Sequence, residues 1–342
     1  MLYAPSALLT AVSLCLLFAT DARAAEAVES KDELAISETF VSDPLRHGWN
    51  VWGDTNLFRW DAASSRLEVT WDSSQSNSYL RLPLRTVLTR ADDFEVALDL
   101  QLRDVVAGVN EDKPSTFQIA FGFQMKSDAE KPGFIRGAGD RSPNLVEFNF
   151  FPDTGFGPTV WPAAFSSAGR LSYTGSGDFS VFDLPLGIVM RVTLRYTGAN
   201  ETATVTITTN GIPVGPLTDA PLAPSFTGFE LDTFAIASYS DDGQRPFMPG
   251  SILAHGAIGD IHVTVPPPPI RSEHGSLVEG RWQASFLSRV GWRYVLEGTS
   301  DLNTWTRVSS SAEGDGGPLL LTDDSTPLSS RRFFRIAATR FQ

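Results

Sequence analysis

The sequence predicts an all-β protein: a large antiparallel β-sandwich of jelly-roll or Greek-key arrangement, followed by a small second β module. Glycine (28 residues) and proline (22 residues) are frequent without a collagen period, which is typical of strands joined by many turns. Apolar residues recur with a period of two in several segments, and long amphipathic helical patterns are absent. The 342 residues, 42% of them hydrophobic, suffice for about two domains with buried cores.

The clearest strand pattern lies in residues 94–102. Every even-numbered residue there is apolar, whereas Glu95, Asp99 and Gln101 occupy odd-numbered positions. Because successive side chains of a strand point to opposite faces, this pattern predicts one face in the core and one in solvent.

Two further segments, residues 191–196 and 201–208, predict an antiparallel hairpin with its turn at residues 197–200. Its apolar residues are expected to face one another on one side: Val192, Leu194, Tyr196, Ala203, Val205 and Ile207. The other side carries a row of threonines, which is typical of a solvated strand. Residues 36–41 and 258–265 open and close the sandwich, and we expect these first and last strands to pair.

Four consecutive prolines at residues 266–269 mark the boundary between the two modules, because proline cannot join a sheet interior and favours an extended spacer. The prediction is a sandwich over residues 36–265 and a small β module over residues 270–342. In that module Trp292, Tyr294 and Leu296 alternate onto one face and are expected to fill its core.

The N-terminus carries the features of a signal peptide. An apolar run precedes the small residues Ala22 and Ala24, so residues 1–24 are expected to be removed and the product to be secreted, periplasmic or on the cell surface. The single cysteine, Cys15, lies in this run. The mature chain would fold without disulfides.

The charge of the chain bears on its partners. Acidic residues (40) outnumber basic ones (27), for a net charge of -13. Such a charge disfavours nucleic acid and anionic lipid as partners, since both would be repelled. No segment after the N-terminal run is apolar and long enough to insert the mature chain in a membrane.

The order of several segments resembles the concanavalin A-like lectin/glucanase superfamily, which includes LamG-type domains. The segments are Phe40 to Trp49, the strand ending at Trp71, the hairpin ending at Gly215 and the closing strand. The resemblance covers about residues 36–265 and implies a jelly-roll sandwich that binds carbohydrate. Residues 270–342 resemble the Ig-like or fibronectin type III-like C-terminal modules of secreted bacterial proteins.

Residues 144–157 are the most informative for chemistry. As a strand, this stretch places Val146, Phe148 and Phe150 on one face and Glu147 and Asn149 on the other, ahead of a turn. Oxygen-bearing side chains then converge at a strand end, and calcium takes six to eight oxygen ligands. The alternative is a polar strand end that is capped by its own turn.

The same stretch looks like the metal-binding strand of legume-type lectins. The resemblance implies that Glu147 takes the place of the transition-metal glutamate, Asn149 of the bridging aspartate, Phe151 of the carbonyl donor and Asp153 of the calcium asparagine. The family requires a further Asp and His, but residues 157–163 contain neither. A single Ca²⁺ site is therefore the metal prediction that stays open.

Three other features are candidate ligand contacts. Asp241 and Asp242 are adjacent carboxylates at a predicted turn, and Arg136 stands among glycines in another loop. Both loops are also explained as plain surface turns. Trp161 follows the candidate metal turn and could stack on a sugar ring, although burial explains it equally well.

Evidence for catalysis is weaker. Endoglucanases of the superfamily carry three carboxylates on one strand, but here Glu230 and Asp232 are followed by Ala235 at the third position. The sequence also lacks the nucleophile-elbow, P-loop and zinc-protease motifs.

We therefore expect a secreted protein that binds carbohydrate or another extracellular polymer without cleaving it. Two alternatives are open. One is a glycoside hydrolase or polysaccharide lyase with a non-standard carboxylate pair, and the other is a structural surface or matrix protein.

Overall fold

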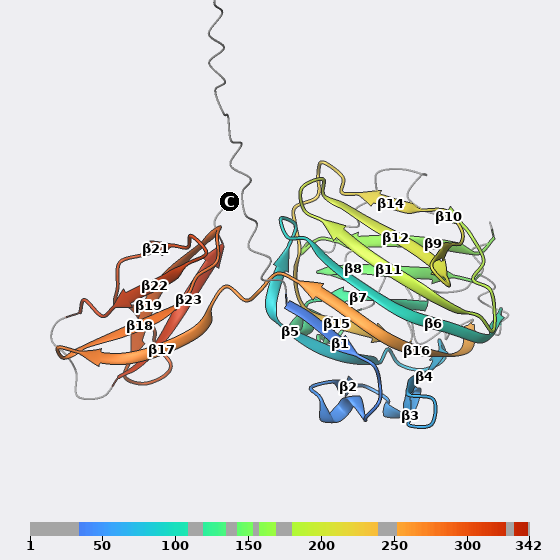
Figure 1. Cartoon of the computed structure of the whole chain (residues 1–342), viewed down its shortest axis with the longest axis horizontal. Coiled ribbons are helices and arrows are strands. Elements are labelled where there is room, and N and C mark those ends of the chain that lie inside the picture. The colour runs from blue at the N-terminus through green and yellow to red at the C-terminus, as the bar shows by residue number, and fades with distance from the viewer. Residues whose placement is uncertain are drawn as a thin grey trace, which may run out of the picture. The chain divides into compact units, whose positions relative to one another are not determined.

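Long strands with alternating burial form most of the structure, as the sequence predicted. The computed structural model describes residues 34–108, 119–134, 142–152, 157–168, 180–238, 252–325 and 332–340. Two large antiparallel sheets face each other in a sandwich, and two smaller sheets follow toward the C-terminus (Figure 1).

The larger sheet has nine strands. Its main order is β13-β12-β11-β6-β16-β4-β3, with β1 also paired to β16 and β14 to β12. The strands are β1 (Leu34–Glu38), β3 (Phe58–Asp61), β4 (Arg66–Asp72), β6 (Phe94–Ala107), β11 (Val189–Thr197), β12 (Thr202–Thr209), β13 (Ile212–Pro213), β14 (Thr218–Pro221) and β16 (Ile252–Val265).

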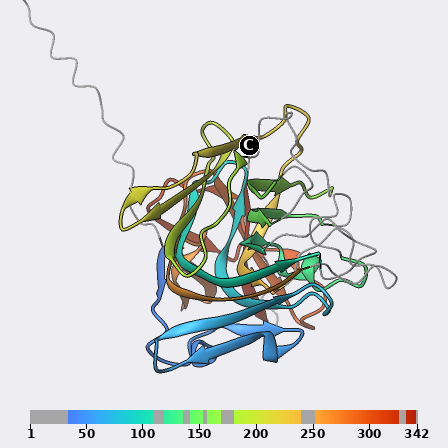
Figure 2. The same ribbon diagram turned by 90° about the vertical axis from the view of Figure 1, so that its right-hand side faces the viewer.

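The opposing sheet has seven strands in the order β10-β9-β8-β7-β15-β5-β2. Figure 2 shows the two sheets as separate layers, with the green strands β7, β8 and β9 in one of them. The strands are β2 (Asn50–Trp52), β5 (Tyr79–Thr89), β7 (Ile119–Gln124), β8 (Leu145–Phe151), β9 (Thr159–Phe165), β10 (Ser180–Val181) and β15 (Glu230–Ala237).

The core between the sheets is built by period-two alternation. In β6 the predicted apolar residues are all buried: Phe94, Val96, Leu98, Leu100 and Leu102. Phe94 stacks on Tyr196 of β11 with ring centroids 4.9 Å apart and meets Phe123 of the opposing sheet edge-on. Tyr196 donates a hydrogen bond of 2.9 Å to the carbonyl of Arg90, and burial raises the pKa of its phenol.

The predicted hairpin is confirmed. In β11 and β12, Val192 pairs with Ile207 and Leu194 with Val205, and all four side chains are buried.

The opening and closing strands also pair as predicted, with Ile36 of β1 opposite Val263 of β16. The opening strand is shorter than the predicted 36–41, because Phe40 adopts a left-handed conformation (φ 55°) and its N–H bonds the carboxylate of Glu38.

The C-terminal part contains a three-stranded sheet, β17-β18-β22, and a four-stranded sheet in which β19 pairs with β20, β21 and β23. The predicted face of Trp292, Tyr294 and Leu296 is buried in one apolar cluster. The strands are β17 (Arg271–Val278), β18 (Arg281–Leu287), β19 (Trp292–Thr299), β20 (Thr306–Arg307), β21 (Ala312–Glu313), β22 (Pro318–Thr322) and β23 (Phe333–Arg340).

Helices are few and short in the described residues. They are the 3-10 turns η1 (Pro44–Arg46) and η2 (Thr55–Leu57), and the single turn α1 (Lys126–Ala129). Within this described part, none of the helices has the length and apolarity to cross a bilayer.

Candidate functional site

The stretch singled out in the sequence forms strand β8, in the middle of the seven-stranded sheet. Val146, Phe148 and Phe150 point into the sandwich core, as predicted. Alternation therefore turns Glu147 and Asn149 to the other side of the sheet, which we call the outer face. Glu147 is completely buried there, and Asn149 is only 1% exposed.

Strand pairing places other side chains in two rows across this outer face. The first row, from β9 to β2, is Ala163, Glu147, Gly122, Ala235, Arg81 and Asn50. The second row consists of Trp161, Asn149 and Ala120 on one side, and Ala237, Tyr79 and Trp52 on the other. Each row therefore has small residues on the central strands β7 and β15 and large polar or aromatic residues on both sides of them.

At one position, Gly122, the backbone itself requires a small residue. A Cβ atom added to Gly122 would lie 2.3 Å from the carbonyl oxygen of Val146 and 2.5 Å from the Cα of Glu147. The strands β7 and β8 approach each other so closely at this point that only glycine fits. Glu147 is consequently held directly beside a residue without a side chain.

One side of the outer face carries a buried cation, Arg81, which is only 5% exposed. Its Nε and Nη2 donate to Oδ1 of Asn50 at 3.1 and 2.9 Å, and its Nη1 forms an ion pair of 2.7 Å with Glu130. These contacts compensate the desolvation of the guanidinium. They also hold Arg81 in one geometry.

Asn149 differs from Arg81 in its hydrogen bonding. Both atoms of its side-chain amide are buried, and neither has a hydrogen-bond partner within the part of the chain that the structure describes. Buried amides are nearly always hydrogen-bonded, and leaving one unpaired costs about 1–3 kcal/mol. The amide therefore keeps hydrogen-bonding capacity that a ligand, an ion or water could use on reaching it.

An aromatic pair stands next to Asn149. Trp161 is its neighbour in the register of β9, and the ring of Trp161 lies 6.4 Å from that of Phe151 at an angle of 32°. Both rings are half-buried. Half-exposed aromatic rings beside buried polar groups are typical of ligand sites.

Part of the outer face is covered by α1 and the turn that follows it. Ala129 and Phe134 pack against Tyr79 and Ala237, and Phe134 also packs against the apolar cluster that includes Trp161. The main chain of Lys126 anchors α1 by donating to Asp232 at 2.8 Å.

The structure brings together some of the residues that the sequence indicated and says nothing of others. Glu147, Asn149, Phe151 and Trp161 lie on adjoining strands at one end of the two rows. The other candidates lie outside the described residues: Arg136, Asp153, Asp241 and Asp242.

The residues present are a partial fit to calcium. Glu147 and Asn149 offer side-chain oxygens and Phe151 a carbonyl, which is fewer than the six to eight donors that calcium takes. In the described ranges there is no group of three or more His, Cys, Asp or Glu side chains suited to a metal. A calcium site here depends on Asp153 and stays a prediction.

Sequence reasoning missed the opposite side of the outer face. Arg81 and Asn50 were not singled out. Gln124, which is 1% exposed at the end of the central strand β7, was also missed. The available signal was a charged residue inside the apolar run of residues 79–84, where period-two alternation predicts a second, non-core face.

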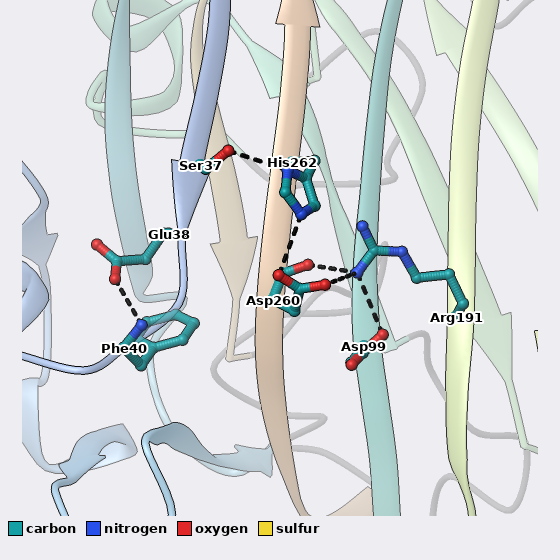
Figure 3. Close-up of polar contacts among 7 residues, drawn as sticks. All are labelled: Ser37, Glu38, Phe40, Asp99, Arg191, Asp260 and His262. Carbon is teal, nitrogen blue, oxygen red and sulfur yellow. Dashed lines mark hydrogen bonds and ion pairs between the residues drawn. The ribbon is translucent and has the colours of Figure 1, made fainter. Parts of the chain in front are cut away.

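A second polar constellation lies on the exposed face of the nine-stranded sheet (Figure 3). Oγ of Ser37 is 3.0 Å from Nδ1 of His262, whose Nε2 is 3.0 Å from the carboxylate of Asp260. Arg191 pairs with both Asp260 and Asp99.

This chain of contacts has the order of a Ser-His-Asp triad but not its environment. The side chains of His262 and Asp260 are each 49% exposed, and Arg191 already neutralises Asp260. Ser37 and His262 are register partners of β1 and β16. We therefore assign the contact to cross-strand pairing rather than to nucleophilic catalysis.

Comparison with known proteins identifies no family. No protein-family model matches the sequence, and no curated protein matches it. Among solved structures, similarity is found to peanut lectin with a nine-residue peptide (TM-score 0.41, 14% identity, 69% of this chain and 100% of that chain).

Two further similar structures are winged bean acidic lectin complexed with methyl-α-D-galactose (TM-score 0.42, 11% identity, 68% of this chain and 98% of that chain) and the alginate lyase Aly36B (TM-score 0.40, 12% identity, 68% and 96%). At these identities the similarity concerns the fold alone. The strand pairing by itself makes the chain an all-β protein with a sandwich of two large antiparallel sheets, followed by small C-terminal sheets.

Proposed function

We propose that this protein binds carbohydrate, or a similar hydroxyl-rich extracellular polymer, at the outer face of its seven-stranded sheet and does not cleave it. The observation that supports this most directly is the buried amide of Asn149, which has no hydrogen-bond partner among the described residues and lies between Glu147 and an aromatic pair.

The chemistry of this group of residues suits a sugar. Each sugar hydroxyl is both a donor and an acceptor, so it needs partners of both kinds. The carboxylate of Glu147 accepts, and the amide of Asn149 both donates and accepts. Trp161 offers an apolar ring surface on which the C–H face of a pyranose can rest. These three residues would therefore contact the ligand together.

The same geometry favours binding over hydrolysis. A glycosidase needs two carboxyl groups about 5–9.5 Å apart across the scissile bond. In the two register rows Glu147 is the only carboxylate. A further carboxylate of this face, Glu130, is paired with Arg81, and Arg81 lies three strands from Glu147, roughly 14 Å at about 4.8 Å per strand.

A glycan array probed with the full chain, with and without calcium, tests the proposal. We expect binding to at least one class of glycan. The affinity should rise in the presence of calcium if Asp153 completes a metal site with Glu147, Asn149 and Phe151. Absence of binding to every glycan in both conditions would leave the structural-protein interpretation. Release of shortened or unsaturated sugars from a bound polysaccharide would establish the enzyme instead.

Variants then locate the binding surface. Trp161→Ala and Asn149→Ala should each weaken binding about tenfold or more, because each removes on the order of 1.5 kcal/mol of contact. Trp305→Ala is the control, since Trp305 is half-buried in the C-terminal part, where it packs on Arg335. Equal loss in Trp305→Ala, or none in the other two, would contradict the assignment.

The location that we propose for this function is outside the cytoplasm. It rests on the predicted signal peptide in residues 1–24 and on a mature chain without cysteine. N-terminal sequencing of the exported protein should begin at Ala25. A product that keeps its first 24 residues and stays in the cytosol would refute it.

A further inference from the structure

An apolar pocket of about 220 Å³ opens between the two sheets, and none of its lining residues belongs to the two rows described above. The lining residues are Leu34, Ile36, His47, Gly48, Leu82, Pro83, Leu84 and Arg85.

The strand pairing explains why a pocket forms there. Leu34 and Ile36 of β1 point inward and pack against the main core, as do Leu82 and Leu84 of β5. The edge strand β2 pairs with β5 only from Tyr79 to Arg81. Beyond Arg81, therefore, that edge of β5 has no strand partner among the described residues, and the apolar side chains of the two sheets border an open space.

The rim of the pocket carries a cation in an unusual conformation. Arg85 lies where β5 bulges: Thr233 of β15 pairs with Pro83, but Leu231 pairs with Leu88, so β5 has extra residues between. Arg85 has φ 59°, which costs a residue with a side chain about 1–2 kcal/mol. Strain of this kind commonly occurs at binding sites.

Arg85 also has no partner of its own. The structure gives its guanidinium no hydrogen bond and no ion pair with any described residue. Other arginines of the sandwich, such as Arg90 and Arg103, are paired with glutamates. In a chain of net charge -13, an unpaired cation at the mouth of an apolar pocket is available to an anion.

The other polar group at the rim is His47. Its Nε2 lies 3.2 Å from Oγ of Ser42, so the ring is oriented by its neighbour rather than by a carboxylate. No acidic side chain lines this pocket. An anionic ligand group would therefore meet one cation and one imidazole without a repelling charge on the lining.

We propose that this pocket binds a small amphiphile with one carboxylate, such as a medium-chain fatty acid, its apolar tail on Leu34 and Ile36 and its carboxylate on Arg85. A volume of 220 Å³ is below the range of about 300–1,000 Å³ for drug-sized ligands. At about 30 Å³ per water-sized group it holds roughly seven such groups, which matches the tail of an eight-carbon acid.

Isothermal titration calorimetry of the full chain with octanoate tests the proposal, with 1-octanol as the uncharged probe of equal tail length. We expect saturable binding of octanoate at millimolar concentration or below, and binding of octanol at least tenfold weaker, because octanol lacks the charge-assisted hydrogen bonds to Arg85. Raising the salt concentration should reduce the difference between the two probes.

Two variants separate the parts of the site. Arg85→Gln should lower the affinity for octanoate about tenfold and leave that for octanol unchanged, whereas Arg59→Gln, an exposed arginine of β3, should change neither. Ile36→Trp should fill the pocket and abolish both. Because Arg85 is exposed, its variant is expected to fold, which a melting curve verifies.

Three results would overturn the proposal: no octanoate binding at millimolar concentration, equal affinity for octanoate and octanol, or unchanged octanoate affinity in Arg85→Gln. None of them depends on the outcome of the glycan array, because the pocket contains no residue of the two rows that we propose to bind glycan.

Discussion

Gly122→Ala tests whether the close approach of β7 and β8 supports both the fold and the outer face. The added Cβ would lie 2.3 Å from the carbonyl oxygen of Val146, and real Cβ contacts essentially never fall below 3.0 Å. The two strands must therefore separate by about 0.7 Å at this point, the difference between these distances. Backbone atoms of a central strand pair cannot move away as a flexible side chain would.

The expected cost is that of overpacking a well-ordered interior, about 1–3 kcal/mol. For a sandwich of this size, 1 kcal/mol corresponds to a shift in melting temperature of about 2–4 °C. Thermal melting followed by circular dichroism should therefore place Gly122→Ala roughly 2–12 °C below the parent protein. Because Glu147 lies opposite Gly122, glycan affinity should fall in the same variant.

Gly259→Ala is the matched control. Gly259 also lies in a central strand and does not have a positive φ, but the nearest atom to its added Cβ is a side-chain carbon of Arg66 at 3.6 Å. That contact is ordinary, so the free energy of unfolding of the variant should lie within about 0.5 kcal/mol of that of the parent. Equal melting of the two variants would refute the steric argument at Gly122.

Two further predictions concern stability. Phe148→Ala removes a fully buried ring whose centroid lies 4.8 Å from that of Phe121, and it should lower the free energy of unfolding in urea by about 3–5 kcal/mol. Phe151→Ala, which removes a half-buried ring on the outer side, should lower it clearly less. Equal losses would contradict the assignment of faces in β8. Hydrogen bonds from Thr304 N–H, the Thr299 hydroxyl and Asn303 N–H lower the pKa of Asp301 from 3.8 to about 2. The stabilisation by Asp301 should be complete above about pH 4 and be lost as the pH falls toward 2. Asp301→Ala should therefore have a lower free energy of unfolding than the parent at pH 6 and the same one near pH 2. A difference that persists near pH 2 would refute this prediction.

Much of the fold could be predicted from local pattern. Because the side-chain period of a strand is two, the alternation in residues 94–102 identifies the core side of β6 without any knowledge of its neighbours. The same holds for the hairpin of β11 and β12, whose short turn also sets its partner and register. Pairing of β1 with β16 was predictable from their positions at the two ends of the sandwich.

The candidate site was predictable only in part, because alternation reports the face of a residue but not the neighbours of its strand. Alternation in β8 puts Glu147 and Asn149 on the face away from the core, but it cannot say which strands lie beside them. The pairing β8-β7-β15-β5 joins segments far apart in the chain. It alone places Arg81 in the row of Glu147.

The sequence by itself thus determined the faces of the strands and the antiparallel all-β class, because these depend on the spacing of side chains along one strand. Only the tertiary structure decided that Gly122 and Ala235 separate Glu147 from Arg81, and that Arg85, without a partner among the described residues, lies beside Ile36. Those contacts arise from long-range strand pairing and from a bulge. Both set distances across the sheet, and neither produces a repeating pattern of residues in the sequence.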